Sequence, residues 1–105
     1  MVEFIERMRQ FASERRLCVT LHARKEMDAD SVGIEALAQA LASATAEIIE
    51  DYPEDQRGHS HLILAWLEGE EAVHVCCALH ESELVIITVY RPDTQEWTQD
   101  MKGRL

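Results

Sequence analysis

The pattern of hydrophobic and polar positions predicts one dominant strand near the C-terminal end of the chain. Residues 84–90 are a run of β-branched and aromatic side chains without a charge, and Arg91 and Pro92 close the run. Such residues pack well on a pleated sheet. A strand that is apolar on both faces is covered on both, so we expect this one in the interior of a sheet. Alternation puts Leu84, Ile86, Thr88 and Tyr90 on one face and Val85, Ile87 and Val89 on the other.

Two amphipathic helices are expected in the first half of the chain. The apolar stripe of a helix over residues 2–15 consists of Phe4, Met8, Phe11 and Ala12. The stripe of a second helix, over about residues 31–42, consists of Ile34, Leu37, Ala38 and Leu41. Asp30 or Ser31 has the side chain to cap the second helix. A short strand over 17–20 and one or two helical turns over 21–28 are expected between the helices.

Three more strands are expected earlier in the chain than the dominant strand. They lie around Glu47–Glu50, over 61–67 and over 72–80, and short polar turns join the later ones. Consecutive strands with short connections pair antiparallel. The pattern therefore predicts a single α+β domain over residues 1–105, with an antiparallel sheet of about four strands and the N-terminal helices on one face. Trp97 is the only large apolar anchor of the polar tail.

The charge of the chain limits its partners. The net charge of −10 argues against free nucleic acid, because phosphate binding needs a basic surface. The charge is uneven, however: residues 1–25 carry six basic and three acidic side chains, and the rest carries four basic and seventeen acidic ones. The N-terminal part is therefore either a local basic face on an acidic body or an ordinary solvated helix face.

The sequence also predicts a cytoplasmic protein. It contains no apolar run of membrane-spanning length, and its first residues are too charged for a signal peptide. The three cysteines are an odd number, and two of them, Cys76 and Cys77, are adjacent in an expected strand. This is not the pattern of a disulfide framework, so we expect reduced thiols.

Several segments together resemble a known bacterial family. They are Thr20-Leu21-His22-Ala23-Arg24 leading to Met27, Glu47 to Pro53, Val73-His74-Val75, and Ile87 to Pro92 with Trp97. The chain is similar to the uncharacterised family called domain of unknown function four-two-five-eight, which is grouped with RelE-like and BrnT-like toxins. The resemblance covers nearly the whole chain in order. One departure is Asp30, where the family usually has an arginine.

The resemblance implies a RelE-like fold and a metal-independent ribonuclease, in which the ribose 2′-hydroxyl attacks the adjacent phosphate. Such chemistry needs a proton acceptor, a proton donor and cations. His22 is the candidate base, and Glu26, four residues later on the same helix face, would orient it. His74 is the candidate acid. The candidate phosphate ligands are Arg24 and Arg91, and Tyr90 could stack on a base.

The resemblance also implies an antitoxin protein as partner, with RNA or the ribosome as target. A non-enzymatic interaction domain is the alternative, because an acidic body suits a basic partner and Asp30 removes a positive charge from the expected RNA-binding face.

Metal binding is a further alternative, on the strand face of His74, Cys76 and His80 or on that of His59 and His61. The usual zinc spacings are missing and a buried cysteine is normally a small hydrophobe, so we expect no cofactor and no stoichiometric zinc.

Overall fold

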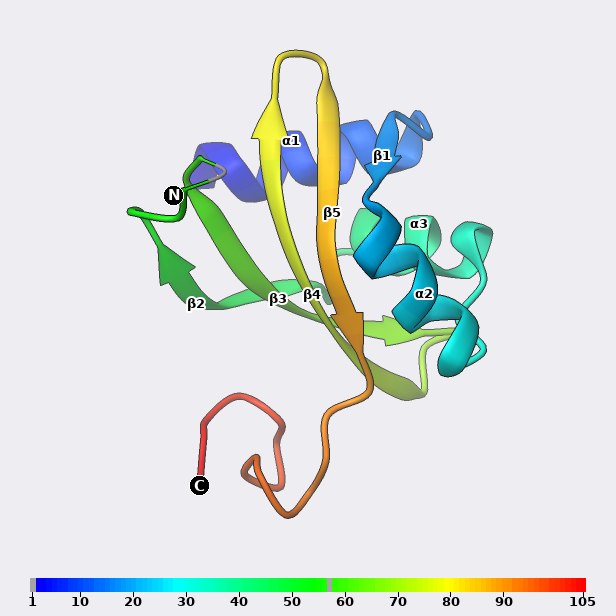
Figure 1. The fold of residues 1–105 in the computed structure, drawn as a ribbon, viewed down its shortest axis with the longest axis vertical. Coiled ribbons are helices and arrows are strands. Elements are labelled where there is room, and N and C mark those ends of the chain that lie inside the picture. Colours follow the sequence, from blue (N-terminus) through cyan, green and yellow to red (C-terminus); the bar gives the residue numbers. More distant parts are fainter. Residues whose placement is uncertain (1, 57) are drawn as a thin grey trace.

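The computed structural model describes residues 2–56 and 58–105, which form three helices and five strands (Figure 1). Their order along the chain is α1 (Val2–Ser13), β1 (Leu17–Val19), α2 (Leu21–Ala29), α3 (Ile34–Ala42), β2 (Glu47–Tyr52), β3 (Ser60–Leu67), β4 (Glu71–His80) and β5 (Glu83–Tyr90). The α+β class predicted from the sequence is confirmed. Within the described residues, none of the helices has the length and apolar character needed to cross a membrane.

The sheet has the strand order β1-β5-β4-β3-β2. The last four strands pair antiparallel, as short connections require, whereas β1 pairs parallel with β5 from Leu17 opposite Leu84 to Val19 opposite Ile86. The sheet therefore has one strand more than the antiparallel core that the sequence predicts. The same pairing places β5 between β1 and β4, which confirms that the dominant strand is interior.

All three helices contribute to a core on one face of the sheet, which we call the helix face. Met8 and Phe11 of α1, Met27 of α2, and Leu37 and Leu41 of α3 are buried in it. The first predicted stripe is thus confirmed. In the second, Ile34 is an exception, because the helix begins at that residue and leaves its side chain in solvent.

The predicted cap of α3 is wrong. Gly33 is the N-cap residue of this helix, and Asp30 is instead the C-cap of α2, where its amide donates to the carbonyls of Glu26 and Asp28. Ser31 has a φ of 56° and ends the turn between the helices. Val32 is buried in the core, and its amide donates to the carbonyl of Met27. Asp30 and Ser31 therefore belong to the turn that brings Val32 into the core, and α3 begins only after Gly33.

The other face of the sheet is covered by the C-terminal segment 91–105, which we call the tail; the sheet face beneath it is the tail face. Trp97 is only 2% exposed and packs with Leu62, Cys76 and Ile87. An antiparallel bridge between Trp97 and Arg104 folds the tail back on itself, below the sheet in Figure 1. Trp97 is therefore the anchor that the sequence predicts.

Two irregularities in the sheet change which side chains share a face. The register shifts between Cys76 and Cys77 of β4, which leaves Ile87 of β5 without an opposite residue. After this bulge Val89 joins Leu84 and Ile86 on the helix face, while Tyr90 joins Ile87 on the tail face. The simple alternation predicted for 84–90 is therefore wrong beyond Ile87. In β2 a similar shift lies between Ile48 and Glu50.

Candidate functional site

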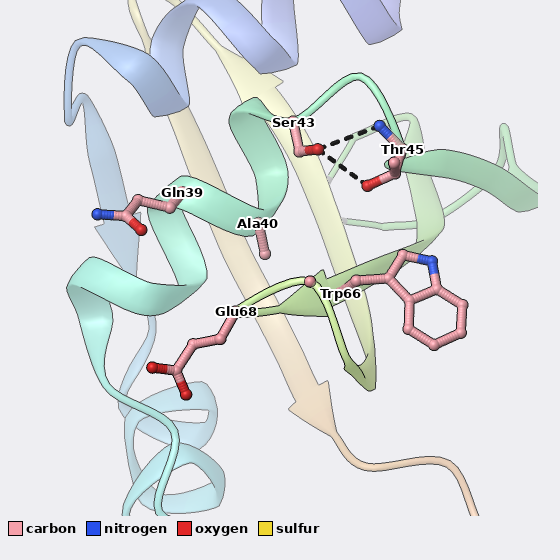
Figure 2. A pocket seen from close by; sticks show the side chains of 7 residues that line it. Gln39, Ala40, Ser43, Thr45, Trp66 and Glu68 are labelled. Atoms are coloured by element: carbon pink, nitrogen blue, oxygen red, sulfur yellow. Dashed lines mark hydrogen bonds between the residues drawn. The ribbon is translucent and has the colours of Figure 1, made fainter.

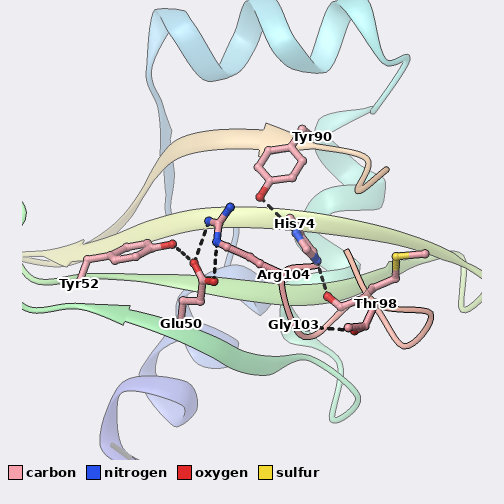
Figure 3. A network of polar contacts seen from close by, with 8 residues as sticks. Glu50, Tyr52, His74, Tyr90, Thr98, Gly103 and Arg104 are labelled. Atoms are coloured by element: carbon pink, nitrogen blue, oxygen red, sulfur yellow. Dashed lines mark hydrogen bonds and ion pairs between the residues drawn. The ribbon is translucent and has the colours of Figure 1, made fainter. Parts of the chain in front are cut away.

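Polar side chains from three strands and the tail meet on the tail face (Figure 3). Glu50 of β2 lies at the centre of one half. Arg104 donates to its carboxylate from Nε at 2.9 Å and from Nη2 at 3.0 Å, and the Tyr52 hydroxyl also donates to it. Glu50 and Tyr52 are two residues apart on a strand and therefore point to the same side. The guanidinium also lies over the ring of Trp97, with its Cζ 4.5 Å from the centroid.

His74 of β4 forms the other half of this arrangement. It lies opposite Tyr90 in the β4–β5 pairing. Its Nδ1 is 3.2 Å from the Tyr90 hydroxyl, and its Nε2 is 2.7 Å from the backbone carbonyl of Met101 in the tail. The ring of Trp97 packs edge-on against it at 4.3 Å. We call Glu50, Tyr52, His74, Tyr90 and Arg104 the tail-face network.

The environment sets the protonation of these groups. Burial would raise the pKa of Glu50, but hydrogen bonds from Arg104 and Tyr52 outweigh it and hold the pKa below its usual range. Burial and the bond to Glu50 raise the pKa of Tyr52 to about 12. Burial lowers the pKa of His74, although the Met101 carbonyl opposes the shift. At neutral pH the network thus combines an ionised carboxylate, a guanidinium, two protonated phenols and a neutral imidazole.

Access to the network is unequal. His74 is fully buried beneath the tail, whereas the side chain of Glu50 is 22% exposed and that of Arg104 is 61% exposed. In this conformation a solvent molecule or ligand can approach the Glu50–Arg104 pair directly. It can reach His74 only after the tail moves.

The predicted residues of α2 occupy a different place, at the edge of the sheet beside β5. His22 Nε2 lies 3.3 Å from the carboxylate of Glu26, so the predicted pair exists, and His22 is well exposed. Glu26 also accepts a hydrogen bond of 2.9 Å from the backbone amide of Val89. Because β1 ends at Val19, this part of β5 has no neighbouring strand on the side away from β4, and Glu26 supplies the acceptor that a strand would otherwise provide there.

Of the two predicted phosphate ligands, Arg91 is bonded at this same edge of the sheet, whereas Arg24 is exposed. The Arg91 amide donates to the Asp30 carboxylate and its Nε to the Asp30 carbonyl, while Nη1 lies 3.5 Å from a Glu71 oxygen. Asp30, the departure from the family pattern, thus positions Arg91. Arg24 is exposed on α2 beside Met27. The six predicted residues therefore fall into two groups, one on α2 and the adjoining end of β5, the other formed by His74 and Tyr90.

Arginines of the first helix and of the turn that follows it are also engaged. Arg9 donates to the backbone carbonyls of Ser43, Ala44 and Ala46 and thereby ties α1 to the loop before β2. Arg15 is paired with Glu35 of α3. These contacts leave less positive charge for a basic face than the N-terminal composition indicates.

A broad hollow of the described surface carries little chemistry (Figure 2). It has a volume of about 570 Å³ and lies between the end of α3 and the β3–β4 turn. Ser43 accepts from the Thr45 amide at 3.2 Å beside it. Among its described lining residues, only Glu68 is ionisable. A carboxylate without a second proton-transfer group or a cation does not make a catalytic site.

Sequence reasoning missed Glu50, Tyr52 and Arg104. The two-residue spacing of Glu50 and Tyr52 is a signal for a shared strand face, although it does not indicate which face. No sequence pattern indicated Arg104, because this residue reaches β2 only when the tail folds back onto the sheet. Among the described residues, the histidines of β4 are not gathered into a metal-binding cluster: His74 is already bonded at both nitrogens, and His80 is exposed at the strand end.

The fold and this face define a small α+β domain with three helices on one side of the sheet and a polar network beneath a C-terminal tail on the other. Residues 19–91 match the family described as Domain of unknown function (DUF4258), and the chain belongs to that family. The match begins at the last residue of β1 and ends just after β5, so it leaves out α1, most of β1 and most of the tail. Neither the curated proteins nor the solved structures include a significant match to the chain.

Proposed function

We propose that the chain is a metal-independent ribonuclease, the toxin-like member of a toxin–antitoxin pair that acts in the cytoplasm. The observation that carries this proposal is the tail-face network, in which an ionised carboxylate, a guanidinium and the protonated phenol of Tyr52 lie within hydrogen-bonding distance on the sheet face opposite the three helices. These groups are those that cleavage of RNA by its own 2′-hydroxyl requires.

Each group has a role in this reaction. Glu50 takes the proton from the ribose 2′-hydroxyl as that oxygen attacks the phosphorus. Arg104 stabilises the negative charge that develops on the phosphoryl oxygens. Tyr52 gives its proton to the departing 5′-oxygen. The new bond joins the 2′-oxygen to phosphorus and the bond to the 5′-oxygen breaks, so the products are a 2′,3′-cyclic phosphate and a 5′-hydroxyl.

The arginine can serve the substrate without leaving Glu50. A guanidinium has five N–H donors, and the bonds to Glu50 use only Nε and Nη2. His74 and Tyr90 are positioning residues in this proposal, because they hold the tail through Met101 and Trp97 and so hold Arg104 over β2. The pair of His22 and Glu26 remains the sequence-based candidate, but Glu26 already has a structural role at the β5 edge.

The proposal is tested by induced expression in a bacterial host. Expression of the parent chain should arrest growth, and Glu50→Gln or Arg104→Ala should relieve the arrest while the circular dichroism spectrum is retained. The matched control is Glu47→Gln, which removes another ion pair between β2 and the tail, the 3.3 Å contact with Lys102, and leaves the network intact. Unchanged growth at high expression, together with intact RNA in a translating extract, would refute the ribonuclease.

The net charge of −10 favours a second candidate function, a non-enzymatic domain that binds a basic protein. Repulsion of RNA extends over about 8 Å at physiological salt, so the ribonuclease needs a substrate that is presented by a ribosome or another partner. In the binding function, an antitoxin-like basic partner would associate with the chain, and its affinity would fall with salt. Substitution of Glu50 and Arg104 would then leave the growth of the host unchanged.

A further inference from the structure

Three metal-binding side chains meet at the β2–β3 edge of the sheet, on the side opposite the tail-face network. Asp51 of β2 lies opposite His61 of β3 in the antiparallel pairing, and His59 precedes the same strand. One ligand atom of each residue lies within 4.8 Å of the other two. We call Asp51, His59 and His61 the edge cluster.

The geometry of the edge cluster is close to that of a tetrahedral metal site. One oxygen of Asp51, Oδ1, lies 2.5 Å from His59 Nε2 and 3.1 Å from His61 Nδ1. In a tetrahedral zinc site with bonds of 2.0–2.1 Å, neighbouring ligand atoms are about 3.3 Å apart. The ligand atoms therefore need to move by only a few tenths of an ångström to about one ångström to surround an ion.

An unsatisfied nitrogen points to a ligand at this position. His61 is only 3% exposed, yet its Nδ1 has no hydrogen-bond partner within the described part of the chain, because the nearby Asp51 oxygen is not aligned for a hydrogen bond. A buried polar atom without a partner is costly, and native structures rarely keep one without a reason. A cation between His61 and Asp51 would satisfy this nitrogen.

The surroundings suit a cation with an open coordination position. His59 and His61 line a pocket of about 370 Å³ together with Glu3, Phe4 and Arg7. The Phe4 ring lies 3.9 Å from that of His61 and shields one side of the ligands.

We propose that Asp51, His59 and His61 form a binding site for a divalent transition metal of the zinc class. Two imidazole nitrogens and one carboxylate oxygen are a ligand set that zinc prefers over magnesium or calcium. Three protein ligands leave a fourth position for water, and the adjoining pocket provides the room for it. This inference replaces the sequence expectation of no zinc, which considered the histidines without Asp51. It is independent of the proposed ribonuclease, whose groups lie on the other face.

The test is zinc binding by the full chain after treatment with a chelator. Calorimetric titration should show one Zn²⁺ per chain, and Co²⁺ should give the intense visible spectrum of a tetrahedral site. His59→Gln and Asp51→Asn should each weaken binding by at least about 100-fold. These two side chains are 47% and 41% exposed, so both variants should fold, which circular dichroism can verify.

The matched control is His80→Gln, which removes an exposed strand-end imidazole outside the edge cluster and should leave zinc affinity unchanged. A parent chain that binds Zn²⁺ more weakly than about 1 mM would overturn the proposal. So would variants at His59 and Asp51 that bind as the parent does, or a His80→Gln variant that loses affinity as they do.

Discussion

Replacement of Trp97 by alanine should release the tail from the sheet. Trp97 is the largest side chain of the core between the tail and the sheet, and it contacts both His74 and Arg104. Burial of up to about 250 Å² of aromatic surface, at about 25 cal/mol per Å², is worth at most about 6 kcal/mol. Part of this surface is already covered in the unfolded chain, so we expect a loss of about 3–5 kcal/mol in the free energy of unfolding.

The same substitution should change the titration of His74. With the tail released, His74 loses the carbonyl of Met101 and gains water, so its pKa should rise towards the ordinary value of 6.5. Urea denaturation measures the first effect, and a proton NMR titration of the imidazole measures the second. The control is Trp66→Ala, because Trp66 is half-buried on β3 and is not among the contacts of His74.

A Trp97→Ala protein that loses less than about 1 kcal/mol and keeps the low pKa of His74 would refute this reasoning. That result would mean that Tyr90 and the strand backbone, rather than the tail, bury the imidazole. The assignment of Arg104 to the network would then also fail, since its position depends on the Trp97–Arg104 bridge.

Three further predictions concern stability. Ile87→Asp puts an unpaired charge between β5 and Trp97 and should cost more than about 3 kcal/mol in urea denaturation, whereas Ile87→Leu should cost under about 1.5 kcal/mol; equal stability of the two would contradict an interior β5. Glu26→Ala leaves the Val89 amide without its acceptor and should cost about 1–3 kcal/mol, with faster hydrogen exchange at that amide; unchanged exchange would count against edge capping. The pKa of His74 is lowered in the folded state. The contribution of the neutral imidazole to the free energy of unfolding is therefore fully present above about pH 6.5 and is lost as the pH falls through the folded-state pKa. His74→Phe should accordingly flatten the acid side of the curve of stability against pH. A curve as steep as that of the parent would contradict this.

Much of the fold could be predicted because the relevant signals are local. The stripe of Met8, Phe11 and Ala12 and the apolar run of β5 each depend on residues that are neighbours in the sequence. The parallel pairing of β1 could not be predicted in this way. It joins Leu17 to Leu84 across most of the chain, and a three-residue strand has too little pattern to indicate its partner.

The candidate site was less predictable, because its members meet through long-range contacts. His22 and Glu26 were paired correctly from their helical spacing. The structural role of Glu26, by contrast, depends on Val89, 63 residues later. Similarly, Arg104 reaches Glu50 across 54 residues, and nothing in the polar tail except Trp97 indicates that the tail folds onto the sheet.

The two bulges explain why strict alternation assigns the candidate site residues of β2 and β5 to the wrong faces of the sheet. If β2 alternated strictly through Ile49, Glu50 would point with Ile48 to the helix face, and Asp51 would point away from His61. If β5 alternated strictly through Ile87, Tyr90 would point with Ile86 to the helix face, away from His74.

Compared with strict alternation along the sequence, one extra residue in a bulge reverses the orientation of every side chain that follows it in the strand. The bulge in β2 therefore decides which face each of two adjacent acidic residues takes, Glu50 the face of the tail-face network and Asp51 that of the edge cluster. The bulge in β5 brings Tyr90 to the same face as Glu50. Bulges are frequent next to functional sites because they re-aim single side chains without changing the sheet. Both candidate sites thus depend on departures from regular strand geometry that hydrophobic periodicity cannot reveal.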